Sequence, residues 1–202
     1  MVYKKISGLL ASLLAAVISF SVLASPAFAE GLPQHWFKVC NQQNGVCNVL
    51  STVFSDIGQP LTTVNIVEMQ GANPSRHLRI VVPTDRLIQE GVRIQIGKGP
   101  VRKAEYLSCV GPSCIADAPL NDELIKEMSN AADMVVTSVN FLGTPNPITV
   151  SMNGFSQVFS SKGMDELTYQ NEQEKIFQMI EKKNKDFDSK IKAAQEKAKN
   201  KN

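Results

Sequence analysis

The sequence predicts a mainly β protein: an antiparallel β-sandwich with one or two short helices and a charged C-terminal α-helix. Between residues 30 and 162, short runs rich in β-branched residues alternate with turns that contain glycine or proline. After residue 162 the chain has no proline, and its apolar residues recur at helical spacing. A leader precedes both parts, so we divide the chain into residues 1–29, 30–162 and 163–202.

The leader has the pattern of a secretory signal peptide. Lysines at positions 4–5 give it a basic start, residues 6–22 are mostly apolar, and Ala27 and Ala29 form a small-x-small cleavage pattern. The apolar stretch contains serines and no basic residues follow it closely, which disfavours an uncleaved membrane anchor. We therefore expect cleavage before Glu30 and export of the mature protein.

The four cysteines, Cys40, Cys47, Cys109 and Cys114, all follow this cleavage site and would meet an oxidising compartment. Four cysteines allow three sets of disulfides, and the sequence alone does not select among them. Geometry favours the two local pairs, because each flanks a turn and facing residues of an antiparallel ladder lie about 4.5 to 5.5 Å apart. A zinc site is less favoured, since an exported chain more often oxidises its thiols.

Length and charge limit the kind of partner. Without the leader 173 of the 202 residues remain, a length suited to one domain with an appendage. Loss of the two leader lysines lowers the basic count from 21 to 19, which equals the 19 acidic residues. This balance gives no reason to expect nucleic acid as a partner. No second apolar stretch is long enough for a bilayer, so we expect no integral membrane span after cleavage.

Up to eight short strands are predicted before residue 162. Val92, Ile94 and Ile96 alternate with polar residues, which indicates a strand with one buried face. The run from Leu61 alternates less cleanly, but its threonines and valines favour a strand. Pro83 ends the run before it, because proline cannot continue a central strand. The predicted strands are 37–40, 47–54, 61–69, 77–82, 92–96, 103–109, 134–141 and 148–152.

Two short helical segments interrupt this β pattern. Asn121 can cap a helix that ends near Ser129, because two acids follow it at the positive end of the helix dipole. Three apolar residues of this helix, the last of them Met128, share one face. A second short turn is expected at residues 155–159, where two phenylalanines would plug the sandwich.

The C-terminal segment predicts a helix from about Asp165 to Lys197. Its apolar residues form one narrow stripe, and pairs such as Glu181 with Lys185 are four apart in the favourable order. Three interpretations stay open: a solvated helical tail, a disordered tail, or a coiled-coil or docking segment that joins two copies or binds a partner. The stripe consists of Ile176, Ile180, Phe187, Ile191, Ala194 and Ala198.

No arrangement of side chains indicates catalysis. The two histidines, His35 and His77, lie near no motif serine and no free thiol, and His35 falls in a segment that we expect to be loose. Residues 97–100 place two glycines around a lysine, but their position between strands favours a hairpin turn over a phosphate loop. We therefore expect that the protein is not an enzyme, with no catalytic residue, no cofactor and no metal site.

Two groups of charged residues could serve a function. Four arginines would form a basic surface for an acidic partner if they shared one face of a sheet, although solvated strand faces explain them more simply. They are Arg76, Arg79, Arg86 and Arg93. Three acids lie close together in sequence, and helix capping accounts for two of them. They are Asp117, Asp122 and Glu123.

Several motifs, taken in order, resemble the invasion-associated locus B family. They are Trp36-Phe37-Lys38-Val39-Cys40 with Cys47, Leu78–Pro83 followed by Gly91–Ile96, Cys109 with Gly111 and Cys114, and the closing Asn153-Gly154-Phe155. The likeness runs from about Trp36 to Phe159. The chain departs from the family at residues 84–87, where a second glycine is common, and in a charged tail after Gly163 that the family core does not require.

The resemblance implies an exported protein of a Gram-negative bacterium, in the periplasm or associated with the outer membrane or cell surface. Members of the family look like β-sandwich proteins, and the founding ones are linked to entry into host cells, notably red cells. The family offers no established catalytic residues. The four cysteines match family cysteines, which implies that they form structural bridges.

We therefore expect an exported, non-enzymatic envelope protein that supports host-cell (erythrocyte) invasion or virulence through surface contacts. Its protein partner is unknown, and would lie on the host cell or in the envelope. One alternative is a periplasmic small-ligand carrier or enzyme, which would need a deep pocket lined by polar groups. The other is a purely structural envelope protein whose C-terminal helix acts as a spacer or a seam between two copies.

Overall fold

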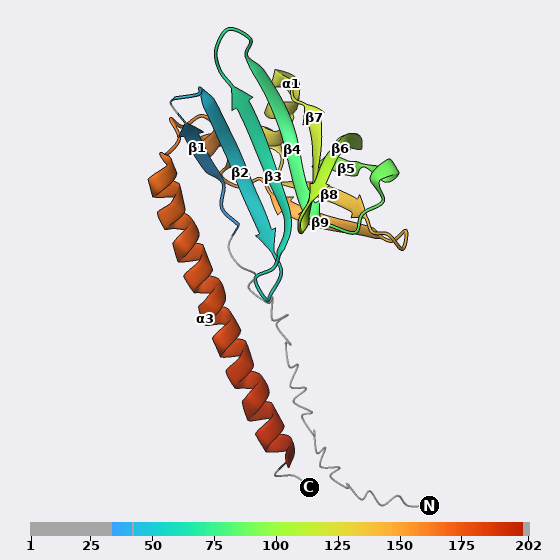
Figure 1. The fold of residues 1–202 in the computed structure, drawn as a ribbon, viewed down its shortest axis with the longest axis vertical. Coiled ribbons are helices and arrows are strands. Elements are labelled where there is room, and N and C mark those ends of the chain that lie inside the picture. Colours follow the sequence, from blue (N-terminus) through green and yellow to red (C-terminus); the bar gives the residue numbers. More distant parts are fainter. Residues whose placement is uncertain (1–33, 42, 200–202) are drawn as a thin grey trace, which may run out of the picture.

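A computed structural model describes residues 34–41 and 43–199, so the predicted signal peptide and its cleavage site lie outside the described residues. Figure 1 shows a strand-rich body and one long helix that runs past it. The elements are β1 (Phe37–Asn41), β2 (Val46–Phe54), β3 (Pro60–Met69), β4 (Ser75–Pro83), η1 (Ile88–Glu90), β5 (Val92–Ile96), β6 (Arg102–Val110), β7 (Ser113–Pro119), α1 (Asp122–Asn130), β8 (Asp133–Val139), β9 (Pro145–Ser151), α2 (Phe155–Phe159) and α3 (Glu166–Lys199).

The strands form a single curled sheet. Its order is β1-β2-β3-β4-β7-β6-β5-β8-β9, and all neighbouring strands are antiparallel. β6 connects the two halves: Ala104 pairs with β5, whereas the residues from Glu105 onward pair with β7. The sheet curls until β9 contacts β2 and β3, which encloses the core as a sandwich would. The mainly β, antiparallel prediction is confirmed, with one continuous sheet forming both layers.

The core follows from the alternation of side chains along each strand. On β4, Leu78 and Ile80 point inward and are buried, while the residues between them face outward. Phe155, at the start of α2, is fully buried and confirms the predicted plug. Trp36 packs edge-on against Phe155 and donates from Nε1 to the carbonyl oxygen of Ser151 at 2.9 Å. The segment that we expected to be loose is therefore anchored in the core from Trp36 onward.

The helix α1 forms as predicted. The side-chain oxygen of Asn121 accepts a hydrogen bond from the backbone N–H of Leu124 at 2.9 Å, which caps the helix. Leu124, Ile125 and Met128 are buried on one face against the sheet. Arg102 on β6 forms two hydrogen bonds with the carboxylate of Glu127, so α1 is also held by charge.

Strand β7 was missed by the sequence analysis. Its residues are Ser-Cys-Ile-Ala-Asp-Ala-Pro, and only Ile115 strongly favours a strand. β7 nevertheless lies in the middle of the sheet, between β4 and β6, where Cys114 and Ala116 are buried. The end of β8 also differs: Asn140 accepts hydrogen bonds from the backbone N–H groups of Leu142 and Thr144, which starts the turn two residues early.

Both disulfides join the predicted local pairs. Cys40 pairs with Cys47 across β1 and β2, with Cα atoms 4.1 Å apart. Cys109 pairs with Cys114 across β6 and β7, with Cα atoms 3.9 Å apart. Each bridge therefore closes one hairpin, and the four sulfurs are not free to bind zinc.

The long helix α3 is attached to the edge of the sheet. Before it, the N–H of Met164 donates to the carbonyl oxygen of Lys38 at 2.7 Å, and the N–H of Cys40 donates to that of Met164 at 3.1 Å. Asp165 caps the helix by accepting from the N–H of Thr168 at 2.8 Å, and this bond lowers the pKa of Asp165. No helix in residues 34–41 and 43–199 combines the length and apolar character needed to cross a membrane.

Candidate functional site

The charged residues singled out from the sequence do not form one surface. Arg76 and Arg79 are three residues apart on β4 and so lie on opposite faces of the sheet. Arg79 donates to Asp117 at 3.2 Å on the outer face. Arg93 is exposed on β5, directly opposite Lys103. The prediction that these arginines share one face of the sheet is therefore wrong.

The histidines also lie apart. His35 is exposed and its ring centroid is 6.3 Å from that of Phe37. His77 lies on the outer face of β4, with Nδ1 2.7 Å from Asp117 Oδ2. The same carboxylate accepts a hydrogen bond from Arg79, so Asp117 on β7 contacts both His77 and Arg79 on the adjacent strand β4. This arrangement is a cross-strand polar row.

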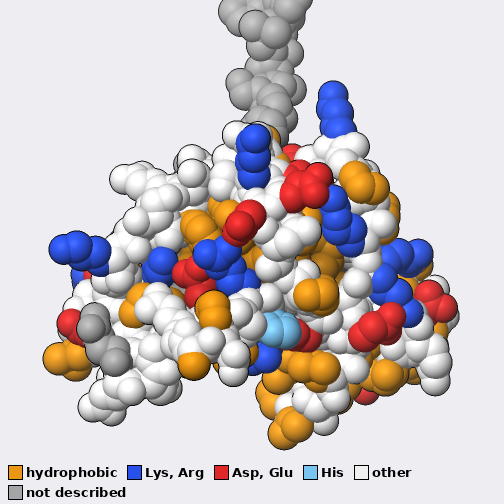
Figure 2. Space-filling model, turned by 90° about the horizontal axis from the view of Figure 1, so that it is seen from above, with side chains coloured by type: hydrophobic (Ala, Val, Ile, Leu, Met, Phe, Trp, Pro, Cys, Tyr) orange, Lys and Arg blue, Asp and Glu red, His pale blue; other side chains and the backbone are white. Residues whose placement is uncertain are grey.

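Acidic and basic groups also meet at the α1 end of the sheet. Glu68 lies 3.2 Å from Lys38 Nζ and accepts from Arg76 Nε at 3.1 Å, and Arg76 also contacts Asp122. Figure 2 shows acidic and basic side chains intermingled over this end. A hollow of about 490 Å³ adjoins them, with Leu120 among its lining residues. Each of these charges has a partner of opposite sign, which offsets the cost of removing Lys38 and Glu68 from water and accounts for the arrangement without a ligand.

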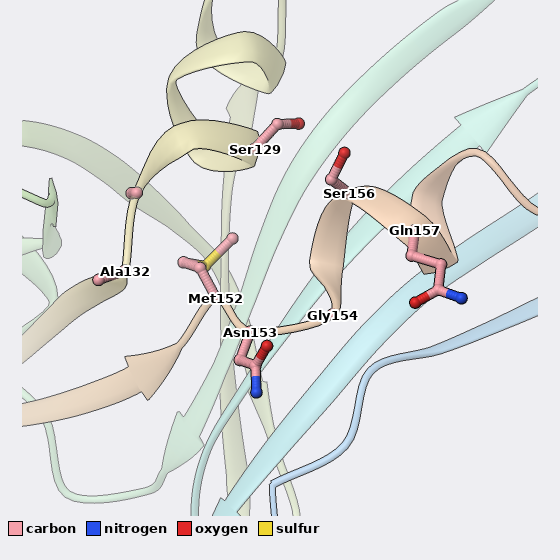
Figure 3. Close-up of a pocket in the computed structure, with 8 residues that line it drawn as sticks. Ser129, Ala132, Met152, Asn153, Gly154, Ser156 and Gln157 are labelled. Atoms are coloured by element: carbon pink, nitrogen blue, oxygen red, sulfur yellow. The ribbon is translucent and has the colours of Figure 1, made fainter.

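A second hollow lies between the end of α1 and the start of α2. Its volume is about 550 Å³, and Figure 3 shows that its side chains are small or neutral. The hydroxyl of Ser129 donates to the carbonyl oxygen of Ile125 and is therefore engaged within α1. The remaining side-chain polar groups of the lining come from Asn153, Ser156 and Gln157. No titratable group lines it, so the hollow does not offer an acid or base.

The turn at residues 97–100 connects β5 and β6 as expected. The N–H of Gly99 donates to the carbonyl oxygen of Ile96 at 2.8 Å, which closes the reversal. A Cβ atom on Gly99 would lie 2.2 Å from Glu127 Oε1, so α1 occupies the space above the turn. The glycines are thus explained by backbone packing.

The strongest candidate is an apolar tip at the opposite end of the sheet. Three segments meet there through backbone hydrogen bonds: Thr84 N–H donates to Pro112 O at 3.0 Å, and Phe141 N–H donates to Asp85 O at 3.0 Å. The β4–β5 loop therefore lies between the β6–β7 hairpin and the β8–β9 turn. Five large apolar side chains on these segments are exposed by 46 to 74%. They are Ile88, Leu107, Val110, Phe141 and Leu142, and we call them the apolar tip.

The apolar tip is built on a rigid base. The Cys109–Cys114 disulfide closes the hairpin that carries Val110. Leu107 is the extra residue at the irregularity of β6, where Tyr106 pairs with Ala116 and Ser108 with Ile115. Clustered exposed apolar residues on a monomer commonly mark an interaction site. This geometry can bind an apolar surface.

Two polar atoms near this end are buried without a hydrogen-bond partner in the described part of the chain. They are Tyr106 Oη and Arg86 Nε. Burial raises the pKa of Tyr106, and the positive charge of Arg86 partly offsets that effect. The tip was not predicted from the sequence, because the strand predicted at residues 134–141 was extended through Phe141. The consecutive Phe141-Leu142 before a Gly-Thr-Pro turn was the available signal.

Comparisons with known proteins give one family. The family model described as invasion associated locus B (IalB) protein matches residues 36–162. The fold is similar to a crystal structure of invasion associated protein B from Bartonella henselae, with a TM-score of 0.54 and 20% sequence identity, covering 64% of this chain and 89% of that one. A comparison with curated proteins found no match. The matched family segment contains the whole sheet, α1 and α2, and ends before α3.

Proposed function

The chain belongs to the invasion associated locus B family, and from that premise we propose that it is an exported, non-enzymatic envelope protein that supports entry into host cells. The proposed host cell is the erythrocyte, or another cell that the bacterium invades. In this proposal the protein acts by surface contact, and the apolar tip is the part that makes the contact. Its partner is an apolar patch on a host-cell surface protein or on another envelope protein.

The observation that carries the proposal is the convergence of exposed apolar side chains on three hydrogen-bonded segments. Phe141 is 64% exposed and Leu142 is 74% exposed within the β8–β9 turn. At protein interfaces, a few side chains that are fully desolvated near the centre supply most of the affinity. The Cys109–Cys114 bridge adds rigidity, which reduces the entropy lost on binding.

Two further observations support the location. Both disulfides are typical of proteins that fold outside the cytoplasm. The leader pattern in residues 1–29 is consistent with export. We propose the periplasm or the outer-membrane surface as the compartment. Fractionation of cells, followed by protease treatment of intact cells, distinguishes the two: a surface protein is cleaved and a periplasmic one is protected.

A complementation experiment tests the role of the apolar tip. A deletion strain receives the parent gene, a Phe141→Ser/Leu142→Ser variant, or a Val101→Ser control. Val101 is 58% exposed but lies at the α1 end of the sheet, away from the tip. The variant should fold, since the backbone bonds of the turn do not use the altered side chains.

The expected result is that the parent and the control restore host-cell entry, whereas the tip variant does not. Export and thermal melting of all three proteins are measured in parallel, so that loss of folding is recognised. Full restoration of entry by the tip variant would contradict a contact role for the tip. A deletion strain that enters cells as the parent strain does would contradict the proposed function itself.

A further inference from the structure

The helix α3 is attached to the sheet through one stripe of side chains. The ring of Tyr169 packs edge-on against Phe37, with centroids 5.8 Å apart. One turn further, Gln173 and Ile176 lie over the outer face of β1 and β2. Ile180 packs so closely on the β2–β3 turn that a Cβ atom on Gly58 would lie 2.1 Å from its Cγ2. The attachment ends where Asn184 Nδ2 donates to the carbonyl oxygen of Ile57 at 3.3 Å.

The same stripe continues beyond the sheet. From Asn184, steps of three and four residues lead to Phe187, Ile191, Ala194 and Ala198. These residues therefore lie on the same side of α3 as the residues that contact the sheet in the first half of the helix. Phe187 is 53% exposed and Ile191 is 43% exposed. Figure 1 shows this part of α3 extending past the end of the sheet. We call residues 185–199 the distal segment.

The shape of this region limits what can cover the stripe. On the stripe side, Phe187 and Ile191 of the distal segment are exposed within the described part of the chain, whereas the sheet fills the space along the first half of the helix. A flat lipid surface that lay along the stripe and covered Phe187 and Ile191 would collide with the sheet. A rod of helix width fits the step between the sheet and the distal segment, because two helices pack about 8 to 10 Å apart.

The charge along α3 is segregated. Residues 166–181 contain four acidic side chains and one lysine, whereas residues 189–199 contain four lysines and one acid. The acidic part lies beside the sheet, outside the distal segment. Within the distal segment, Asp186 and Asp188 come first and Lys197 and Lys199 come last, so two distal segments that run in opposite directions place these acids of one copy beside these lysines of the other. Asp56, on the β2–β3 turn beside Lys183, adds negative charge where the end of a second helix would lie.

We propose that the distal segment pairs with the distal segment of a second copy of this chain, antiparallel and about a two-fold axis. Phe187 and Ile191 of one copy then pack against the alanines near the end of the other, and Asp188 lies near Lys199 of the second copy. The surface is self-complementary, as a two-fold interface requires. Fifteen residues give an overlap of about 22 Å, so the dimer is expected to dissociate on dilution in the micromolar range.

Sedimentation equilibrium of the mature, disulfide-bonded chain over a wide range of concentrations tests the proposal. Phe187→Glu should weaken association at least about tenfold, because it puts a charge into the apolar seam. Ser189→Glu makes the same change in charge on the opposite face of α3 and should leave association within about twofold of the parent. Both variants should melt like the parent at low concentration, since within the described residues the attachment of α3 to the sheet ends at Asn184, before the distal segment.

Zero-length carboxylate–amine cross-linking of a mixture of ¹⁴N and ¹⁵N chains tests the direction. Antiparallel pairing predicts links between Asp188 of one copy and Lys197 or Lys199 of the other. A link from Asp188 to Lys183 between copies would indicate parallel helices and would overturn the arrangement.

A chain that stays monomeric at every concentration, or a dimer that Phe187→Glu leaves unchanged, would overturn the pairing. So would a monomer that binds vesicles of phosphatidylglycerol and phosphatidylethanolamine and loses that binding with Phe187→Glu. Host-cell entry is not used as a readout, so failure of the pairing and failure of the proposed function are distinguishable.

Discussion

The ammonium nitrogen of Lys38 lies 3.2 Å from Glu68 Oε2, and each of these side chains is only 11% exposed. Lys38 also donates to the carbonyl oxygen of Phe159 at 2.8 Å and lies over the phenyl ring of that residue. The ion pair therefore joins β1 and β3 to the end of α2. It is the most enclosed ion pair among those found in the described part of the chain.

Removal of one partner of this pair should be costly. Glu68→Ala leaves Lys38 buried without its carboxylate, and we expect the free energy of unfolding to fall by about 3 kcal/mol. Glu105→Ala is the matched control, because the Lys103–Glu105 pair is exposed and should contribute less than about 1 kcal/mol. Urea denaturation at neutral pH measures both. Equal losses in the two variants would show that burial does not strengthen the Lys38–Glu68 pair.

A second prediction concerns two glycines that share the same backbone angle. Gly163 and Gly143 both have φ of +78°, but a Cβ atom at Gly163 would lie 2.8 Å from Cys40 Sγ, whereas Gly143 has open space. Gly143→Ala should destabilise by about 1 kcal/mol, the cost of a left-handed alanine. Gly163→Ala should destabilise by at least about 1 kcal/mol more, because the disulfide or the α2–α3 linker must move. Thermal or urea unfolding of the two variants gives the difference, and indistinguishable values would contradict the close contact.

The disulfides should differ in what they hold in place. Replacement of Cys40 and Cys47 by serine should lower stability by about 2 kcal/mol and should also increase hydrogen exchange in the first half of α3, since Met164 is bonded to the bridged strand. Replacement of Cys109 and Cys114 should lower stability by a similar amount.

The second replacement is the control for the first. It should increase exchange at the apolar tip and leave α3 protected, because that bridge lies in the β6–β7 hairpin. Mass-spectrometric hydrogen exchange on the two variants makes the comparison. Equal loss of protection in α3 would mean that the Cys40–Cys47 bridge does not fix the start of the helix.

The parts of the fold that could be predicted are those that local chemistry decides. Val92, Ile94 and Ile96 alternate because one face of β5 is buried, and Asn121 caps α1 with its own side chain. The cysteines could be paired locally because each pair flanks a tight turn. In all these cases the predictive pattern is contained in one short segment of the chain: an alternation, a capping residue or a turn between two cysteines.

The missed features depend on contacts between distant residues. β7 has a weak strand pattern and forms because β4 and β6 offer hydrogen bonds on both sides. Trp36 is ordered by Phe155 and Ser151, which lie more than 100 residues later. The predicted grouping of the arginines was wrong for a reason visible in the sequence. Side chains alternate between the two faces of a strand, and Arg76 and Arg79 are an odd number of residues apart. The apolar tip became visible only when three separate turns were brought together.

Tyr106 gives a prediction at neutral pH. Its hydroxyl oxygen is buried and has no hydrogen-bond partner in the described part of the chain. Tyr106→Phe removes a polar group whose burial is uncompensated, so stability should stay the same or rise by up to about 1 kcal/mol. Urea denaturation of the variant and the parent measures the change. A loss of more than about 1 kcal/mol would show that the hydroxyl makes a stabilising interaction.

The same residue predicts how stability depends on alkaline pH. Burial raises the pKa of Tyr106 above its ordinary value of 10.0, and the charge of Arg86 only partly opposes this. The unfolded chain therefore loses the phenol proton at lower pH than the folded chain does. The folding stability that depends on the neutral phenol of Tyr106 is fully present below about pH 10, and it is lost as the pH rises through the raised pKa of the folded state.

Tyr106→Phe should thus lose less stability than the parent between about pH 10 and pH 11. Burial also raises the pKa of Tyr169, so a Tyr106→Phe/Tyr169→Phe double variant should flatten the curve further. Urea midpoints measured across this range make the comparison, and parallel curves for parent and single variant would show that Tyr106 titrates alike in both states.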